Sequence, residues 1–184
     1  MKVTFTKVDV KRYEITIVRE HGPALLPRYG PGYDDLMPHD LAHYLVEESY
    51  GIQLGVWGQL AAGGGGIFTP APWDNSLANK KRTQRIGAIG RGDMVRSEQL
   101  VQLTVATWER SVGRNKHQIP AYVEFGAEDL DKAVRRMSAV AERWSSLQHG
   151  GSIEFSWPAR LTFNPAKSQR GRRLSARTSV AARN

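Results

Sequence analysis

Residues 2–18 read KVTFTKVDVKRYEITIV. Apolar and polar side chains alternate in both halves of this stretch, with Val3 and Phe5 in the first half and Tyr13 and Ile15 in the second. Alternation with a period of two is typical of a strand that buries one face. The polar residues between the two runs predict a turn, so we expect a β-hairpin.

Further elements extend from this hairpin. Residues 152–157 alternate in the same way and predict a third strand, which needs the edge of the hairpin as a partner. Helical periodicity predicts helices over residues 38–50, 97–112 and 127–148. The fold class expected is therefore α+β, a small antiparallel sheet packed against about three helices.

Glycine and proline divide the chain. Residues 21–38 and 51–95 are rich in both, and the second stretch includes four consecutive glycines at 63–66. We therefore expect residues 51–95 to form a long, partly mobile loop within a single domain of residues 1–160. Residues 161–184 contain mainly Arg, Ser, Ala and Gly, which predicts a disordered basic tail.

Composition limits the function classes. Hydrophobic residues make up 40% of the 184 residues, enough for a packed core. Cysteine is absent, which excludes disulfides, thiolate metal sites and cysteine nucleophiles. The sequence contains neither an apolar run that could span a bilayer nor a secretion signal. We therefore expect a cytoplasmic protein with no membrane partner.

Positive charge is concentrated in two segments of a chain whose net charge is +8. Residues 80–96 hold six Lys and Arg against one acid, and residues 166–184 hold six with none, so the remainder is mildly acidic. Such segments attract nucleic acid or an acidic protein, although basic tails also serve solubility alone. The candidate nucleic-acid-binding residues are Lys80, Lys81, Arg82, Arg85, Arg170, Arg172 and Arg173.

His39 and His43 have the spacing of metal ligands. Two histidines four residues apart lie on one face of a helix, where their nitrogens can meet one divalent ion, with zinc favoured. Asp40 and Glu47 lie on the same polar face and are candidate catalytic residues, although this face could equally be only solvated. A third ligand would come from elsewhere, with His21, His117, His149, Asp34 and Asp35 as candidates.

Two resemblances involve this helix. The pattern is similar to the His-Glu-x-x-His helix of zinc metalloproteases, with Asp40 in place of the glutamate that acts as general base. The segments Met37-Pro38-His39-Asp40-Leu41-Ala42-His43 and Gly55-Val56-Trp57-Gly58 resemble a family of small uncharacterised bacterial proteins. That second resemblance implies one domain and no particular activity.

Three hypotheses follow from different classes of function. The first is a divalent-metal-binding and hydrolytic protein using His39 and His43. The second is non-specific nucleic-acid binding through residues 80–96 and 167–183. The third is a non-enzymatic accessory protein that binds a partner through residues 51–95. Only the first assigns chemistry to individual residues, and whether the chain is an enzyme stays open here.

Overall fold

A four-stranded antiparallel sheet forms one layer of the computed structural model, which describes residues 1–9, 11–31 and 35–164. The strand order is β3-β2-β1-β4, so the predicted hairpin lies at the centre and the C-terminal strand pairs with its first strand. Phe5 is opposite Ile15 on one side and Ile153 on the other, which places three apolar side chains in one row. The strands are β1 (Lys2–Asp9), β2 (Arg12–Val18), β3 (Arg28–Pro31) and β4 (Ser152–Ser156).

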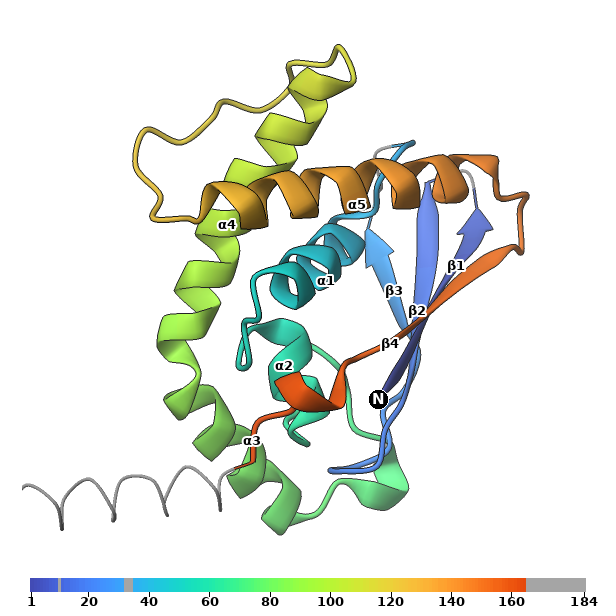
Figure 1. Ribbon diagram of the computed structural model, residues 1–184. Helices are drawn as coiled ribbons and strands as arrows, with labels where there is room; N and C mark the ends of the chain where they lie inside the picture. Colours follow the sequence, from blue (N-terminus) through green and yellow to red (C-terminus); the bar gives the residue numbers. More distant parts are fainter. Residues whose placement is uncertain (10, 32–34, 165–184) are drawn as a thin grey trace, which may run out of the picture.

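Helices cover one face of this sheet (Figure 1). α1 lies between the sheet and α4. α5 runs from α4 across α1 toward one end of the sheet. The α+β class is thereby confirmed, with more helices than the three expected. They are α1 (His39–Ser49), α2 (Val56–Ala61), α3 (Leu77–Ile89), α4 (Arg91–Ser111) and α5 (Ala127–Ser146), with short 3-10 helices η1 (Pro72–Asp74) and η2 (Ala159–Leu161).

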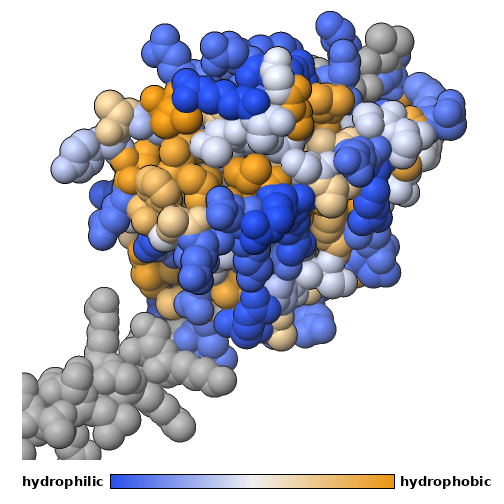
Figure 2. Space-filling model, turned by 45° about the horizontal axis from the view of Figure 1, so that its top comes forward, coloured by the Kyte–Doolittle hydropathy of each residue, from blue (hydrophilic) through white to orange (hydrophobic). Residues whose placement is uncertain are grey.

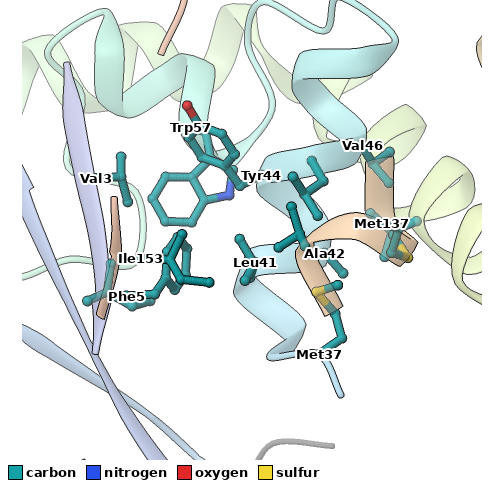
Figure 3. Packing of buried hydrophobic residues seen from close by; sticks show 14 of the residues in the cluster. Val3, Phe5, Met37, Leu41, Ala42, Tyr44, Val46, Trp57, Met137 and Ile153 are labelled. Atoms are coloured by element: carbon teal, nitrogen blue, oxygen red, sulfur yellow. The ribbon is translucent and has the colours of Figure 1, made fainter. Parts of the chain in front are cut away.

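The core lies between the sheet and α1. Figure 3 shows Phe5 and Ile153 of the sheet facing Leu41 of α1, with Trp57 of α2 beside them. The ring of Trp57 meets Phe5 edge-on at a centroid distance of 5.6 Å and Tyr44 at 5.4 Å. Such edge-to-face pairs add to the gain from burying large apolar side chains. On the face of the molecule that Figure 2 shows, patches of hydrophobic side chains lie between hydrophilic ones.

The expected long loop over residues 51–95 is a wrong prediction, because this stretch contains α2, η1, α3 and the start of α4. Gly63 and Gly66 adopt positive φ and turn the chain after α2. The Arg19 guanidinium donates hydrogen bonds to the carbonyl oxygens of Leu60 and Gly64 and so ties this turn to the end of β2. Ile86 is the one α3 residue among those described that is fully buried, so α3 has no apolar stripe for periodicity to detect.

Strand β3 lies in the stretch 21–38 that was predicted to be loop only. It is an edge strand of four residues, and Gly30 pairs with Tyr13 of β2. A Cβ on Gly30 would lie 2.0 Å from the Tyr13 ring, so the ring needs a glycine beneath it. Glycine and proline are tolerated at such an edge, although both are signals against a strand in the sequence.

The chain continues to pack past the predicted domain end at residue 160. Leu161 is 7% exposed and belongs to the core, so the basic tail does not begin at residue 161. Residues 165–184 lie outside the described residues. The predicted disorder of the tail and the candidate residues Arg170, Arg172 and Arg173 fall within that range. No helix in the described part of the chain is long and apolar enough to cross a membrane.

Candidate functional site

The polar face of α1 is covered by α4, which changes the interpretation of that face. The sequence placed His43 and Glu47 on the solvent side of the helix, but they are only 4% and 0% exposed. His39 begins α1 and remains exposed. The amphipathic pattern missed this burial because α1 packs against helices on one side and the sheet on the other.

The two histidines converge as their spacing predicts. The Nε2 atoms of His39 and His43 are 3.2 Å apart, and the ring planes meet at 75° with centroids 4.7 Å apart. Glu98 of α4 places a carboxylate close to the pair, with Oε2 3.7 Å from His43 Nε2. No pattern in the sequence pointed to Glu98, because none specifies which turn of α4 meets α1.

Ser97 orients the buried histidine. Its hydroxyl donates to Glu47 Oε1 at 2.9 Å, so the Ser97 oxygen can accept a hydrogen bond from the Nδ1–H of His43 at 3.3 Å. In this arrangement the proton of neutral His43 is on Nδ1, and the Nε2 lone pair is directed toward His39. Burial lowers the pKa of His43, which Glu98 opposes by raising it and the neighbouring His39 reinforces. The neutral form is therefore the favoured one.

Glu47 binds the start of α2 and does not contact the histidines directly. Its carboxylate accepts backbone N–H groups of Val56 at 2.7 Å, Trp57 at 2.9 Å and Gly58 at 3.4 Å. Burial raises the pKa of Glu47 to about 7, although these donors and Ser97 act in the opposite direction. The carboxylate thus caps α2 and reaches His43 only through Ser97.

Asp40 is engaged with the sheet. Its Oδ2 accepts from the Tyr13 hydroxyl at 2.5 Å and from Arg28 Nη1 at 2.9 Å. Both donors come from strands, so this carboxylate fixes the first turn of α1 against β2 and β3. Asp40 therefore does not occupy the position of a base beside the histidine nitrogens, as the metalloprotease-like pattern would require.

Among the described residues, none of the foreseen third ligands joins the pair. Within residues 1–9, 11–31 and 35–164, no group of three or more His, Cys, Asp or Glu side chains could hold a metal ion. His117 instead pairs with Glu109, its Nδ1 3.0 Å from Oε2. Asp34 lies outside the described residues.

The basic residues of the 80–96 segment lie on a helix rather than on a loop. Lys80, Lys81, Arg82 and Arg85 are all exposed on α3, whose N-terminus is capped by the Ser76 side chain. Serine is a residue type favoured at helix N-caps, so Ser76 was a sequence signal for the start of α3. The helix is amphipathic only weakly, because its neighbours bury little more than Ile86.

Close contacts require glycine at both ends of the Gly55-Val56-Trp57-Gly58 motif. A Cβ on Gly55 would lie 2.3 Å from the Glu47 carboxyl carbon, and one on Gly58 would lie 2.1 Å from the Gln53 carbonyl oxygen. The resemblance to small bacterial proteins itself stays a prediction. No protein-family model matches this chain, and no curated protein or solved structure is significantly similar to it.

Proposed function

We propose that this protein binds a divalent transition metal ion, with zinc favoured, through Nε2 of His39 and His43. The observation that supports the proposal is the 3.2 Å separation of these two nitrogens. With Zn–N bonds of about 2.0–2.1 Å, that separation corresponds to an N–Zn–N angle of about 100°, close to the tetrahedral value. Two imidazoles on one helix can thus bind one ion without a change of backbone.

The neighbouring side chains support the same proposal. A metal-binding histidine usually donates the N–H of its second ring nitrogen to a fixed acceptor. For His43 that acceptor is the Ser97 oxygen, which is itself held by Glu47. The Glu98 side chain is exposed, with Oε2 3.7 Å from His43 Nε2, but within the described residues no third side chain completes a metal site as the side chains lie. Water would complete the coordination at the surface.

The proposal concerns binding and does not extend to hydrolysis through Asp40. A general base must lie within hydrogen-bond reach of the water it activates. The Asp40 carboxylate is held by Tyr13 and Arg28 on the sheet side of α1. Glu47 is likewise occupied by the backbone of α2.

The test is a metal titration of the untagged chain, with Zn²⁺ by calorimetry and Co²⁺ by visible absorption. We expect one ion per chain, and weaker binding as the pH falls into the acid range, because imidazole must be neutral to bind metal. His39→Ala removes an exposed ligand without disturbing the core and should lower the affinity at least about ten-fold. Ser97→Ala should lower it by roughly ten- to a hundred-fold through the orientation of His43.

His21→Ala is the matched control, because His21 is also exposed but lies outside α1. It should bind Zn²⁺ as the wild type does. Equal affinity in His39→Ala and wild type would refute the site, and so would a wild-type chain that takes up neither ion. A Co²⁺ spectrum of octahedral type would instead show that oxygen ligands dominate and would contradict a zinc-like site.

A further inference from the structure

Helix α3 carries unbalanced positive charge. Between Leu77 and Ile89 it holds Lys80, Lys81, Arg82 and Arg85 and no acidic residue. All four cations are exposed, and no hydrogen bond or ion pair engages them among the described residues. Their charge is therefore available to an external anion.

The acids at the two ends of α3 do not neutralise this charge. Asp74 accepts the backbone N–H of Ala24 at 2.8 Å and the side-chain amide of Asn79 at 3.3 Å. Asp93 accepts the backbone N–H of Leu54 at 2.8 Å. Both carboxylates thus act as local structural acceptors, and the cations between them remain unpaired.

Two hollows lie beside α3 and meet at Arg82 and Phe163. The smaller, of about 310 Å³, is lined by Lys81, Arg85 and the apolar side chain of Ile89. The larger, of about 1030 Å³, extends toward η2 and includes Arg160. Cationic side chains and an aromatic ring therefore share one concave surface, although these residues are far apart in the sequence.

We propose that this surface binds single-stranded nucleic acid, with Lys81, Arg82, Arg85 and Arg160 contacting phosphates and Phe163 packing against a base. Proteins that bind single strands combine a positively charged groove with an aromatic side chain on which bases stack. A duplex hides its base faces and would use only the cations. The combination of apolar and cationic side chains in a hollow favours the single strand.

The experiment measures binding of a fluorescent single strand of about 12 nucleotides, within the site sizes of single-strand binders. The assay is done on metal-free protein without added metal. The competitors are the matching duplex and inorganic polyphosphate. The variant K81Q/R82Q/R85Q should bind about ten-fold more weakly and reduce the slope of log affinity against log salt by about 2, since each phosphate contact contributes about 0.7. Phe163→Ala should weaken single-strand binding at least about five-fold and leave polyphosphate binding unchanged.

K132Q/R135Q/R143Q is the matched control, because it removes the same charge from exposed positions of α5. It should retain the wild-type salt slope. The proposal is overturned if the α3 variant and this control bind equally, which would place binding outside α3. It is equally overturned if duplex and polyphosphate compete as well as single strand and Phe163→Ala has no effect. Because metal is absent throughout, these outcomes do not depend on the histidine site.

Discussion

The buried carboxylate of Glu47 allows a quantitative test of the network behind the histidines. Its side chain is 0% exposed, and burial raises its pKa from 4.5 to about 7. A rise of that size corresponds to about 3 kcal/mol of preference for the protonated form in the folded state. Replacing Glu47 by Gln removes the ionisable group while keeping the shape of the side chain.

The sign of the pH dependence follows from the direction of the shift. A group whose pKa is higher in the folded chain stabilises it fully below the unfolded value of 4.5, and this contribution is lost as the pH rises through about 7. The wild type should therefore lose roughly 2–3 kcal/mol relative to Glu47→Gln between about pH 5 and pH 8.

The assay is urea unfolding of both proteins at several pH values, with the difference in unfolding free energy plotted against pH. Glu142→Gln, an exposed carboxylate of α5, controls for the loss of one surface charge. A difference in unfolding free energy, wild type minus Glu47→Gln, that stays constant or increases as the pH rises would refute the reasoning. It would mean that the N–H groups of α2 and the Ser97 hydroxyl keep the carboxylate ionised despite burial.

Two further substitutions test how α2 is held. Gly55→Ala places a methyl group 2.3 Å from the Glu47 carboxyl carbon and should lower the unfolding free energy in urea by about 1–3 kcal/mol. Gly92→Ala, which meets open space on α4, should be neutral or stabilising, and equal effects of the two substitutions would contradict the close contact. Arg19→Met removes the donors to the carbonyls of Leu60, Gly64 and Pro23 and should cost about 1.5–3 kcal/mol, with faster proteolysis in residues 62–67. Unchanged proteolysis would show that the turn after α2 holds without Arg19.

The sheet and the strongly periodic helices could be predicted because their patterns are local. Alternation predicted β1, β2 and β4, and the apolar stripe predicted α5. Helix α3 was missed because its residues bury little, and hydrophobic periodicity measures burial. It begins at a serine cap, and its Thr83 hydroxyl accepts a hydrogen bond from the Gly65 N–H, features that contribute no periodic signal.

The candidate site was predictable only in part. The spacing of His39 and His43 follows from helix geometry and required no knowledge of the tertiary fold. Ser97 and Glu98 come from α4, and their approach to α1 depends on how two helices pack, which the sequence pattern does not specify. For the same reason the partners of Asp40 and Glu47, on strands and on α2, could not be derived from the residues alone.

The contacts of α1 separate its structural polar residues from those left for a ligand. Asp40 is bound by Tyr13 and Arg28, Glu47 by the backbone of α2, and Glu48 by Arg136. Each of these carboxylates thus has a donor from a neighbouring element that accounts for its presence. The Nε2 atoms of His39 and His43 instead lie 3.2 Å apart, within hydrogen-bond distance of each other, and the exposed Glu98 carboxylate lies 3.7 Å from His43 Nε2. The proposed metal ion would take the place of this imidazole–imidazole contact, and the Zn²⁺ titration of His39→Ala tests that proposal.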